Sequence, residues 1–492
     1  MKAVMLCRVL AIALVCVLSV GHAFGQDAGA LLDLLVRKKL ITDQEAKEVR
    51  AELVKESAST SAGKWKLSTP ITELELYGDA RVRYEIRNGE TVTDDTQQRN
   101  RERYRLRLGL RGTLADDWFF GVRLETSQNP RSTNVTFGDD TSGSSGGGGG
   151  PFAKGSDGIN VGQAYLGYKG FPDITLTAGK MPNPLITTFM VWDPDLNPEG
   201  LSEQWKHTLT VALGGDEEEP EAAGYSKDGT LLPVTKKTSG GSKLKIDVFA
   251  NFGQFVYDDA NPENPLGPSP RKIPNTDSFL LAWQVGARFT FPNTLYAQVA
   301  PTLYNYTGSG DTFNGFFKGG DPNLSNKTSL AQNQTGINSL LVFDLPVEVG
   351  WKLGELPMRL FADFAVNLEA DDRAAAAGHP GKGDQRYAYQ IGAAVGQLKK
   401  KGDWQLSAFW QRQDQYSLDP NLVDTEFWDS KLNMEGVGVT FGYMLSDAVW
   451  LNFLYGYAER ADRTLGTGGN GDIAANPLKN LQLFQADLNV KF

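Results

Sequence analysis

Alternation between apolar and polar side chains from residue 73 onward constrains the fold of this chain more than any other feature. In residues 73–87, Leu74, Leu76 and Val82 share one face of the expected strand, and Arg81 and Arg83 share the other. Successive side chains of a β-strand point to opposite faces, so such a strand needs one apolar and one aqueous surrounding. The pattern recurs at residues 101–111, 118–125, 243–252, 279–289, 358–369, 449–457 and 484–492.

These stretches are longer than the ~5–6 residues usual in soluble sheets. A two-sheet soluble sandwich also alternates, but it does not explain the strand length or the regular short turns. After residue 24 no run approaches the ~20 apolar residues that a spanning helix needs. A hydrophobic content of only 40% agrees with strands that alternate between lipid and water. We therefore expect an all-β, transmembrane antiparallel barrel.

Tight turns near residues 114–117, 170–173, 291–294, 353–355, 400–403 and 445–447 alternate with long loops, as in outer-membrane barrels. We expect sixteen strands, beginning near residues 72, 99, 117, 159, 173, 207, 243, 278, 294, 336, 356, 386, 403, 433, 448 and 480. Sixteen strands would enclose a water-filled lumen. Residues 214–242 fit least, because they form a long acidic segment at a short-turn end. A hidden hairpin there would give eighteen strands, or the sixth strand is misplaced.

The amino-terminal region has the pattern of a secretory signal peptide over residues 1–25. Lys2 and Arg8 flank the start of an apolar stretch, and small residues precede the expected cleavage after Gly25. Both cysteines, Cys7 and Cys16, lie in this signal. The mature chain is then expected to have neither a disulfide nor a thiolate metal site. It would keep 47 basic and 59 acidic residues, a net charge of −12 that argues against nucleic acid as a partner.

Three further parts are expected: a short helical periplasmic segment (26–57), a linker (58–71) and the barrel (72–492). A capping box from Thr42 to Glu45 supports the helical segment. About thirty residues cannot bury a core alone. The segment is therefore either a loose extension or a helical hairpin that self-associates or binds a partner.

The final strand, residues 484–492, closes on Phe492 and resembles the assembly signal of Gram-negative outer-membrane barrels. The stretch Gln163 to Tyr168, followed by Ala178-Gly179-Lys180, is similar to a strand pair of the bacterial porins. The chain most closely resembles a family known as putative porins. The resemblance covers roughly residues 72–492 and implies an outer-membrane location, a homotrimer, and contacts with lipid, lipopolysaccharide and the barrel-assembly machinery. The acidic Pro-Glu-Phe-Gly loop motif of the general porins is missing.

Arginines gather on the polar faces of the first three expected strands. If the apolar faces meet lipid, these side chains line the lumen side by side on neighbouring strands. Guanidinium groups stay charged at ordinary pH, so they would attract anions and repel cations. Near strand ends, they could instead meet lipopolysaccharide phosphates or pair with Glu85, Glu102 and Glu125. The candidate pore-lining residues are Arg81, Arg83, Arg101, Arg103, Arg105, Arg107, Arg111 and Arg123.

The third long loop, residues 182–205, is the candidate constriction loop, and its acids are Asp193, Asp195, Glu199 and Glu203. The porin resemblance implies that this loop folds into the barrel and narrows it. An acidic loop facing an arginine wall would set up a transverse field that orients dipolar solutes. A solvated external loop is the alternative. The start Asp193-Pro194-Asp195 is typical of a calcium loop, but the following spacing fails, so no metal is expected.

No catalytic arrangement, cofactor motif or energy source stands out. We expect a porin rather than an enzyme, passing small hydrophilic solutes and ions by diffusion, with a preference for anions. The alternatives are a substrate-selective channel, for phosphate-like anions or oligosaccharides, and a structural or adhesive envelope barrel. The aromatic residues Trp410, Trp428, Phe441, Tyr443, Tyr455 and Tyr457 are expected to form an interfacial girdle.

Overall fold

The structure is a computed structural model that describes Gln44, Lys47 and residues 68–127, 132–137, 158–213, 242–258, 277–308, 339–467, 473 and 478–492. The chain divides into two units, residues 1–68 and 69–492, and the second holds every strand of the described residues. The predicted signal peptide, most of the linker and most of the helical segment lie outside the described residues. Within that segment, Gln44 and Lys47 are helical.

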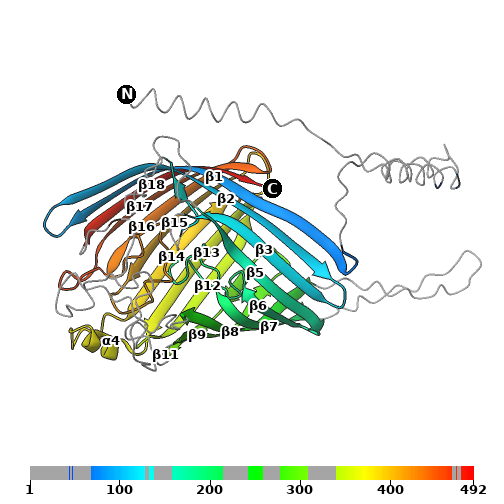
Figure 1. Ribbon diagram of the computed structural model, residues 1–492, viewed down its shortest axis with the longest axis horizontal. Coiled ribbons are helices and arrows are strands. Elements are labelled where there is room, and N and C mark those ends of the chain that lie inside the picture. The colour runs from blue at the N-terminus through cyan, green and yellow to red at the C-terminus, as the bar shows by residue number, and fades with distance from the viewer. Residues whose placement is uncertain are drawn as a thin grey trace, which may run out of the picture. The chain divides into compact units, whose positions relative to one another are not determined.

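The strands form one antiparallel sheet that closes on itself (Figure 1). β1 (Ile71–Thr91) pairs with β2 (Thr96–Leu114) on one side and with β18 (Leu478–Lys491) on the other. Every other strand pairs with its neighbours in chain order. Their bounds are β3 (Trp118–Ser127), β5 (Gly158–Phe171), β6 (Ile174–Lys180), β7 (Glu199–Leu213), β8 (Ser242–Asp258), β9 (Ser278–Thr290), β12 (Leu341–Leu353), β13 (Leu356–Asn367), β14 (Tyr387–Gly396), β15 (Trp404–Gln413), β16 (Met434–Met444) and β17 (Val449–Arg460).

Three short pieces complete the barrel: two of them together form its sixteenth strand, and the third adds no crossing. β10 (Tyr296–Val299) and β11 (Thr302–Gly308) both pair with β9 and β12, so they form one strand path interrupted at Pro301. Proline has no N–H to give to the ladder, which explains the break. β4 (Val135–Thr136) pairs with β2 beyond the end of β3. The predicted sixteen-stranded barrel is confirmed.

The barrel wall is polar inside and apolar outside, because each strand alternates. On β1, Val82 is 51% exposed whereas its neighbour Arg83 is 2% exposed. On β18, Phe484 is 37% exposed whereas Gln485 is fully buried. This reverses the arrangement of a soluble protein and suits a wall whose outer surface meets lipid.

Fifteen of the predicted strand starts lie within five residues of those in the structure, and the sixth strand is misplaced. β7 begins at Glu199, eight residues before the expected start at residue 207. Its first residues are too polar to be recognised as a strand from sequence. Leu213 of β7 pairs with Ser242 of β8, so the connection between these neighbouring strands is residues 214–241, which lie outside the described residues.

One short helix, α4 (Ala370–Ala376), lies in the segment between β13 and β14. No helix among the described residues is long and apolar enough to cross a membrane.

Candidate functional site: an arginine cluster and two inward loops

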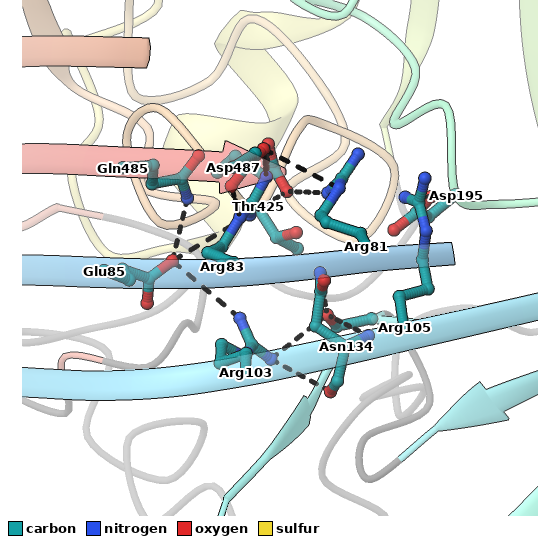
Figure 2. A network of polar contacts seen from close by, with 12 residues as sticks. Arg81, Arg83, Glu85, Arg103, Arg105, Asn134, Asp195, Thr425, Gln485 and Asp487 are labelled. Carbon is teal, nitrogen blue, oxygen red and sulfur yellow. Dashed lines mark hydrogen bonds and ion pairs between the residues drawn. The ribbon is translucent and has the colours of Figure 1, made fainter. Parts of the chain in front are cut away.

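The arginines of β1 and β2 lie on the inner face of the barrel, as the alternation predicts. Arg83, Arg103 and Arg105 are each at most 7% exposed. The strand register places Arg81 directly opposite Arg105, and Arg83 directly opposite Arg103. Like charges in direct cross-strand pairs repel each other, so this wall requires negative partners. Figure 2 shows three of them, Glu85 of β1, Asp487 of β18 and the loop residue Asp195, beside the arginines of β1 and β2.

Arg105 and Arg107 share the carboxylate of Asp79 on β1. Arg105 donates to Asp79 over 2.7 Å and Arg107 over 2.6 Å. The same two arginines meet Asp195, whose Oδ1 lies 3.8 Å from Nη1 of Arg105 and 3.4 Å from Nη1 of Arg107. Asp195 belongs to the loop between β6 and β7. A loop carboxylate therefore completes the pairing that the wall begins.

Arg81 and Arg83 also contact one carboxylate of the wall and one carboxylate of a loop. Arg83 donates from Nε and Nη2 to the two oxygens of Asp487 on β18, over 2.7 and 2.9 Å. Its Nη1 donates to Glu426 over 2.5 Å. Arg81 donates to Asn489 over 3.0 Å and lies 3.6 Å from both Glu426 and Asp487. Glu426 belongs to the loop between β15 and β16, so a second loop also supplies a carboxylate.

Glu85 is buried, and several arginines of β1 and β2 surround it. It accepts a hydrogen bond from Arg101 over 2.7 Å, and Gln485 donates to its other oxygen over 2.8 Å. Nitrogens of Arg87, Arg103 and Arg83 lie 3.6 to 4.0 Å from it. The pairing with Glu85 that the sequence offered as an alternative to pore lining therefore occurs on the inner face of the wall.

Arg111 and Arg123 lie at the edge of this set. Arg111 pairs with Glu75 over 2.6 Å, and its side chain is 56% exposed. Arg123 pairs with Glu125 over 2.8 Å. Both pairs therefore join residues of the strands β1, β2 and β3.

Residues 181–198, which we call the first inward loop, run through the interior of the barrel. Ile186 exchanges two hydrogen bonds with Gln284 of β9. Thr188 donates to Asp363 of β13, and Gln413 of β15 donates to the carbonyl of Met190. Because Asp195 contacts β2, the loop touches nearly opposite sides of the sixteen-strand ring.

Residues 414–433, which we call the second inward loop, also fold into the barrel. The backbone N–H and hydroxyl of Thr425 both donate to Asp193 of the first inward loop over 3.1 Å. Asp429 pairs with Arg87 of β1. Phe427 packs on Phe409 of β15, with ring centroids 4.7 Å apart. Among the described residues, the second inward loop therefore joins the first in the interior.

Three sequence assignments are corrected by this geometry. Glu199 and Glu203 lie on β7 and not in the loop. Glu203 shares the face of Leu201 and Trp205, which are 53% and 40% exposed and mark the outer surface. Trp428 is 3% exposed in the second inward loop and so does not belong to an interfacial girdle.

Asp193 and Asp195 do lie in the first inward loop, but they face other protein groups. Asp193 accepts from Thr425, and Asp195 accepts a hydrogen bond from Thr133 in addition to its arginine contacts. No group of three or more His, Cys, Asp or Glu side chains could hold a metal ion in the part of the chain that the structure describes.

Two acids of the second inward loop, Asp424 and Glu426, have pKa values that are shifted in opposite directions. Burial would raise the pKa of Glu426, but the charges of Arg83 and Arg81 outweigh it and hold that pKa well below its usual value. Burial raises the pKa of Asp424, and the negative charges of Asp193 and Glu426 raise it further. Glu426 is therefore held in its charged form, whereas Asp424 tends to keep its proton.

Sequence reasoning missed the partners of the arginines: Asp79, Asp487, Glu426 and Asp429. Two of these could be recognised from their strands: Asp79 shares the parity of the inward-facing arginines on β1, and Asp487 shares the polar face of β18 with Gln485 and Asn489. For the second inward loop, the signal is an apolar content that a solvated loop does not need: Tyr416, Leu418, Leu422, Val423, Phe427, Trp428 and Leu432.

A closed antiparallel barrel with an apolar outer face and a charged inner face defines an outer-membrane channel-forming barrel. The profile of the family described as "Putative porin" matches residues 87–344, just over half of the chain, and the chain belongs to that family. It is an outer-membrane porin channel.

Solved structures similar to this chain include two porins at low identity. One is a double mutant of the Rh. blastica porin, with 10% identity and a TM-score of 0.36, covering 85% of this chain and all of that one. The other is OprB of Pseudomonas putida, with 10% identity and a TM-score of 0.44, covering 85% of this chain and 94% of that one. No curated protein matches the chain in sequence.

Proposed function

We propose that this porin passes small hydrophilic solutes and ions by passive diffusion, and that it prefers anions. The observation that carries this is the charge of the wall beside the loops. Within the described residues, Arg83, Arg105 and Arg107 hydrogen-bond two wall carboxylates, Asp79 and Asp487, and Arg81 lies 3.6 Å from Asp487. Glu85 comes no closer than 4.0 Å to Arg83 and is shared with other arginines. This part of the wall, without the carboxylates of the two loops, therefore carries more positive than negative charges.

The first inward loop would be the main constriction, because it crosses the interior between β2 and β13. Solutes would then pass between the loop and the wall. This role rests on Asp193 and Asp195 alone among the predicted constriction acids, since Glu199 and Glu203 lie on β7.

The test is a reversal-potential measurement on the purified protein in planar bilayers under a potassium chloride gradient. An anion-preferring channel gives a chloride-to-potassium permeability ratio above one. A ratio at or below one contradicts the preference, and the absence of any conductance contradicts diffusion itself and would favour an envelope barrel with a structural role.

A substrate-selective channel is the second candidate, and the second inward loop favours it. A wide diffusion pore needs one constricting segment, whereas here two segments share the interior and contact each other at Asp193 and Thr425. Liposome-swelling rates over a series of uncharged sugars and carboxylates of increasing size would separate the two. A swelling rate that declines smoothly with solute size favours general diffusion. A solute that permeates faster than its size predicts favours selectivity.

The barrel also has expected partners in the membrane. We propose that the apolar outer face contacts lipid and lipopolysaccharide, that the barrel forms a homotrimer, and that the strand ending at Phe492 is recognised by the barrel-assembly machinery. Phe492 pairs through its backbone with Gly78 on β1 in both directions, at 2.9 and 3.1 Å. The channel needs no catalytic residue, cofactor or nucleic-acid partner for this function.

A further inference from the structure

Glu426 reaches the arginine cluster from a loop rather than from the barrel wall. One oxygen accepts from Nη1 of Arg83 over 2.5 Å, and the other lies 3.4 Å from Nη2 of the same guanidinium. Arg81 adds a second positive group, with Nη1 3.6 Å from Glu426. This forked contact is the way in which arginine recognises carboxylates and phosphates in general. The pair of arginines is therefore shaped to receive an oxyanion, and the chain's own carboxylate is the one it receives.

Arg81 is not fully satisfied by that carboxylate. Its Nη1 is buried and makes no hydrogen bond to the described residues. Arg105 lies directly opposite Arg81 across the β1–β2 register, with no carboxylate between them on the strands. A buried N–H group that makes no hydrogen bond to the described residues, and that lies beside the cations Arg83 and Arg105, favours an additional or larger anion at this position.

We propose that Arg81 and Arg83, with Arg105 beside them, form a binding site for the carboxylate or phosphate group of a permeating solute, and that Glu426 is the resident occupant which the solute displaces. The inference rests on the proposed anion-preferring channel and names the site at which permeating anions would bind. Glu426 acts as a tethered competitor, so that only a solute with more charge or more acceptor oxygens than a single carboxylate occupies the site for long.

Displacement requires only local movement. The side chain of Glu426 is 26% exposed, whereas that of Asp487, the wall carboxylate on the same arginine, is 2% exposed. The backbone of the second inward loop is held independently at Thr425, which donates to Asp193, and at Asp429, which pairs with Arg87. Glu426 can therefore turn away from the arginines while the loop stays in the barrel.

The test compares four forms of the full-length protein: wild type, Glu426→Gln, the double variant Arg81→Gln/Glu426→Gln, and Glu435→Gln. Glu435 is the matched control, since it pairs with Arg412 over 3.2 Å but shares the face of the outward-facing Val437. Binding of inorganic phosphate and of succinate is measured separately by calorimetry in detergent, and block of chloride current by each is measured in bilayers. The two probes distinguish a phosphate site from a carboxylate site.

We expect Glu426→Gln to bind at least one probe about tenfold more tightly than wild type, because the competing charge is gone and the arginines remain. The double variant should lose that gain, and Glu435→Gln should match wild type. Equal affinity in wild type and Glu426→Gln overturns the proposal, and so does a gain that persists in the double variant. Glu426→Ala replaces Glu426→Gln if the latter fails to give a heat-modifiable folded barrel.

These outcomes are separable from those of the proposed function. A wild-type channel without anion preference, or without conductance, contradicts the proposed function in the bilayer. The calorimetric difference between wild type and Glu426→Gln still decides whether Glu426 occupies an oxyanion site.

Discussion

Asp195 of the first inward loop contacts Arg107 of β2, with Oδ1 3.4 Å from Nη1. The sequence suggests a loop acid and an arginine wall separated by the constriction, with a transverse field between them. Charges in direct contact produce little field at a distance, so Asp195 serves mainly to anchor the loop and to neutralise part of the wall.

Neutralising Asp195 should therefore increase the preference for anions. In Asp195→Asn, Arg105 and Arg107 keep Asp79 as the acid to which both donate hydrogen bonds. We expect the chloride-to-potassium permeability ratio to rise several-fold at low salt, where charges are least screened. Reversal potentials in a salt gradient measure it. Glu199→Gln is the control, because Glu199 pairs with Lys180 on β6 outside this cluster; an equal shift in that variant would mean that Asp195 has no special role.

Glu85 should be among the acids most important for stability. It is fully buried and pairs with Arg101, with three more arginines within 4.0 Å. Removing one partner of a buried ion pair costs roughly 3–5 kcal/mol, because the remaining charges lose their compensation. We expect Glu85→Gln to lower the free energy of unfolding by about that amount, as measured by urea unfolding in detergent.

Glu75→Gln gives the matching surface comparison. Glu75 also pairs with an arginine of β2, Arg111, but both side chains are at least half exposed. Exposed pairs contribute about 0–1 kcal/mol. A loss as large as that of Glu85→Gln would contradict the view that burial sets the difference.

Asp424 should make the stability of the barrel interior depend on pH. Its pKa is raised in the folded protein by burial and by Asp193 and Glu426. Wild-type stability should therefore fall as pH rises from about 4, the usual aspartate pKa, to the raised value in the fold, by at most about 1.4 kcal/mol for each pH unit crossed. Asp424→Asn cannot ionise, so its stability advantage over wild type should grow across that window and then level off. Thermal unfolding midpoints against pH measure it.

Asp94 provides a control of opposite sign for the same experiment. Its hydrogen bond and charge contact with Lys479 lower its pKa. Its contribution is present above the ordinary aspartate pKa and is lost as pH falls through the lowered value. Asp94→Asn should therefore differ from wild type at neutral pH and converge with it in acid. Parallel curves for wild type and Asp424→Asn would contradict the assignment of Asp424.

Gly78 should be essential for closing the barrel beside Phe492. A Cβ at Gly78 would lie 2.5 Å from the carbonyl oxygen of Arg107 and 2.7 Å from the Phe492 ring. We expect Gly78→Ala to lower the yield of heat-modifiable barrel in refolding, because the backbone of β2 cannot yield without breaking its pairing with β1. Gly402→Ala is a control at a turn glycine with no atom within 4 Å, although its positive φ of 85° adds a small local strain. Equal yields for wild type and Gly78→Ala would contradict this role.

The sequence predicts which face each side chain occupies, because a period of two needs no long-range information. Arg83, Arg103 and Arg105 are inside for this reason, and Val82 and Leu106 are outside. The predicted start of β7 is wrong. Glu203 is polar although it faces outward, so the first residues of this strand do not alternate between apolar and polar side chains in the expected way.

The pairing of Arg83 with Asp487 and Glu426 could not be predicted, because it depends on closure and on loop folding. Arg83 and Asp487 are 404 residues apart, and Arg83 and Glu426 are 343 residues apart. The first pair requires the register between β1 and β18, which is set only when all sixteen strands are in place. The second requires a loop whose direction no local pattern specifies.

The pairing of β1 with β18 joins the first strand of the barrel to the last, and the Arg83–Asp487 ion pair lies on that seam. Until β18 is added, Arg83 has no wall carboxylate within hydrogen-bonding distance among the described residues, so an unclosed barrel presents an open edge lined with uncompensated positive charge. Completion of the sheet and pairing of Arg83 with Asp487 are thus a single event. A chain halted before β18 would lack both, and it would expose a charged, unpaired edge, whereas a finished barrel has no edge.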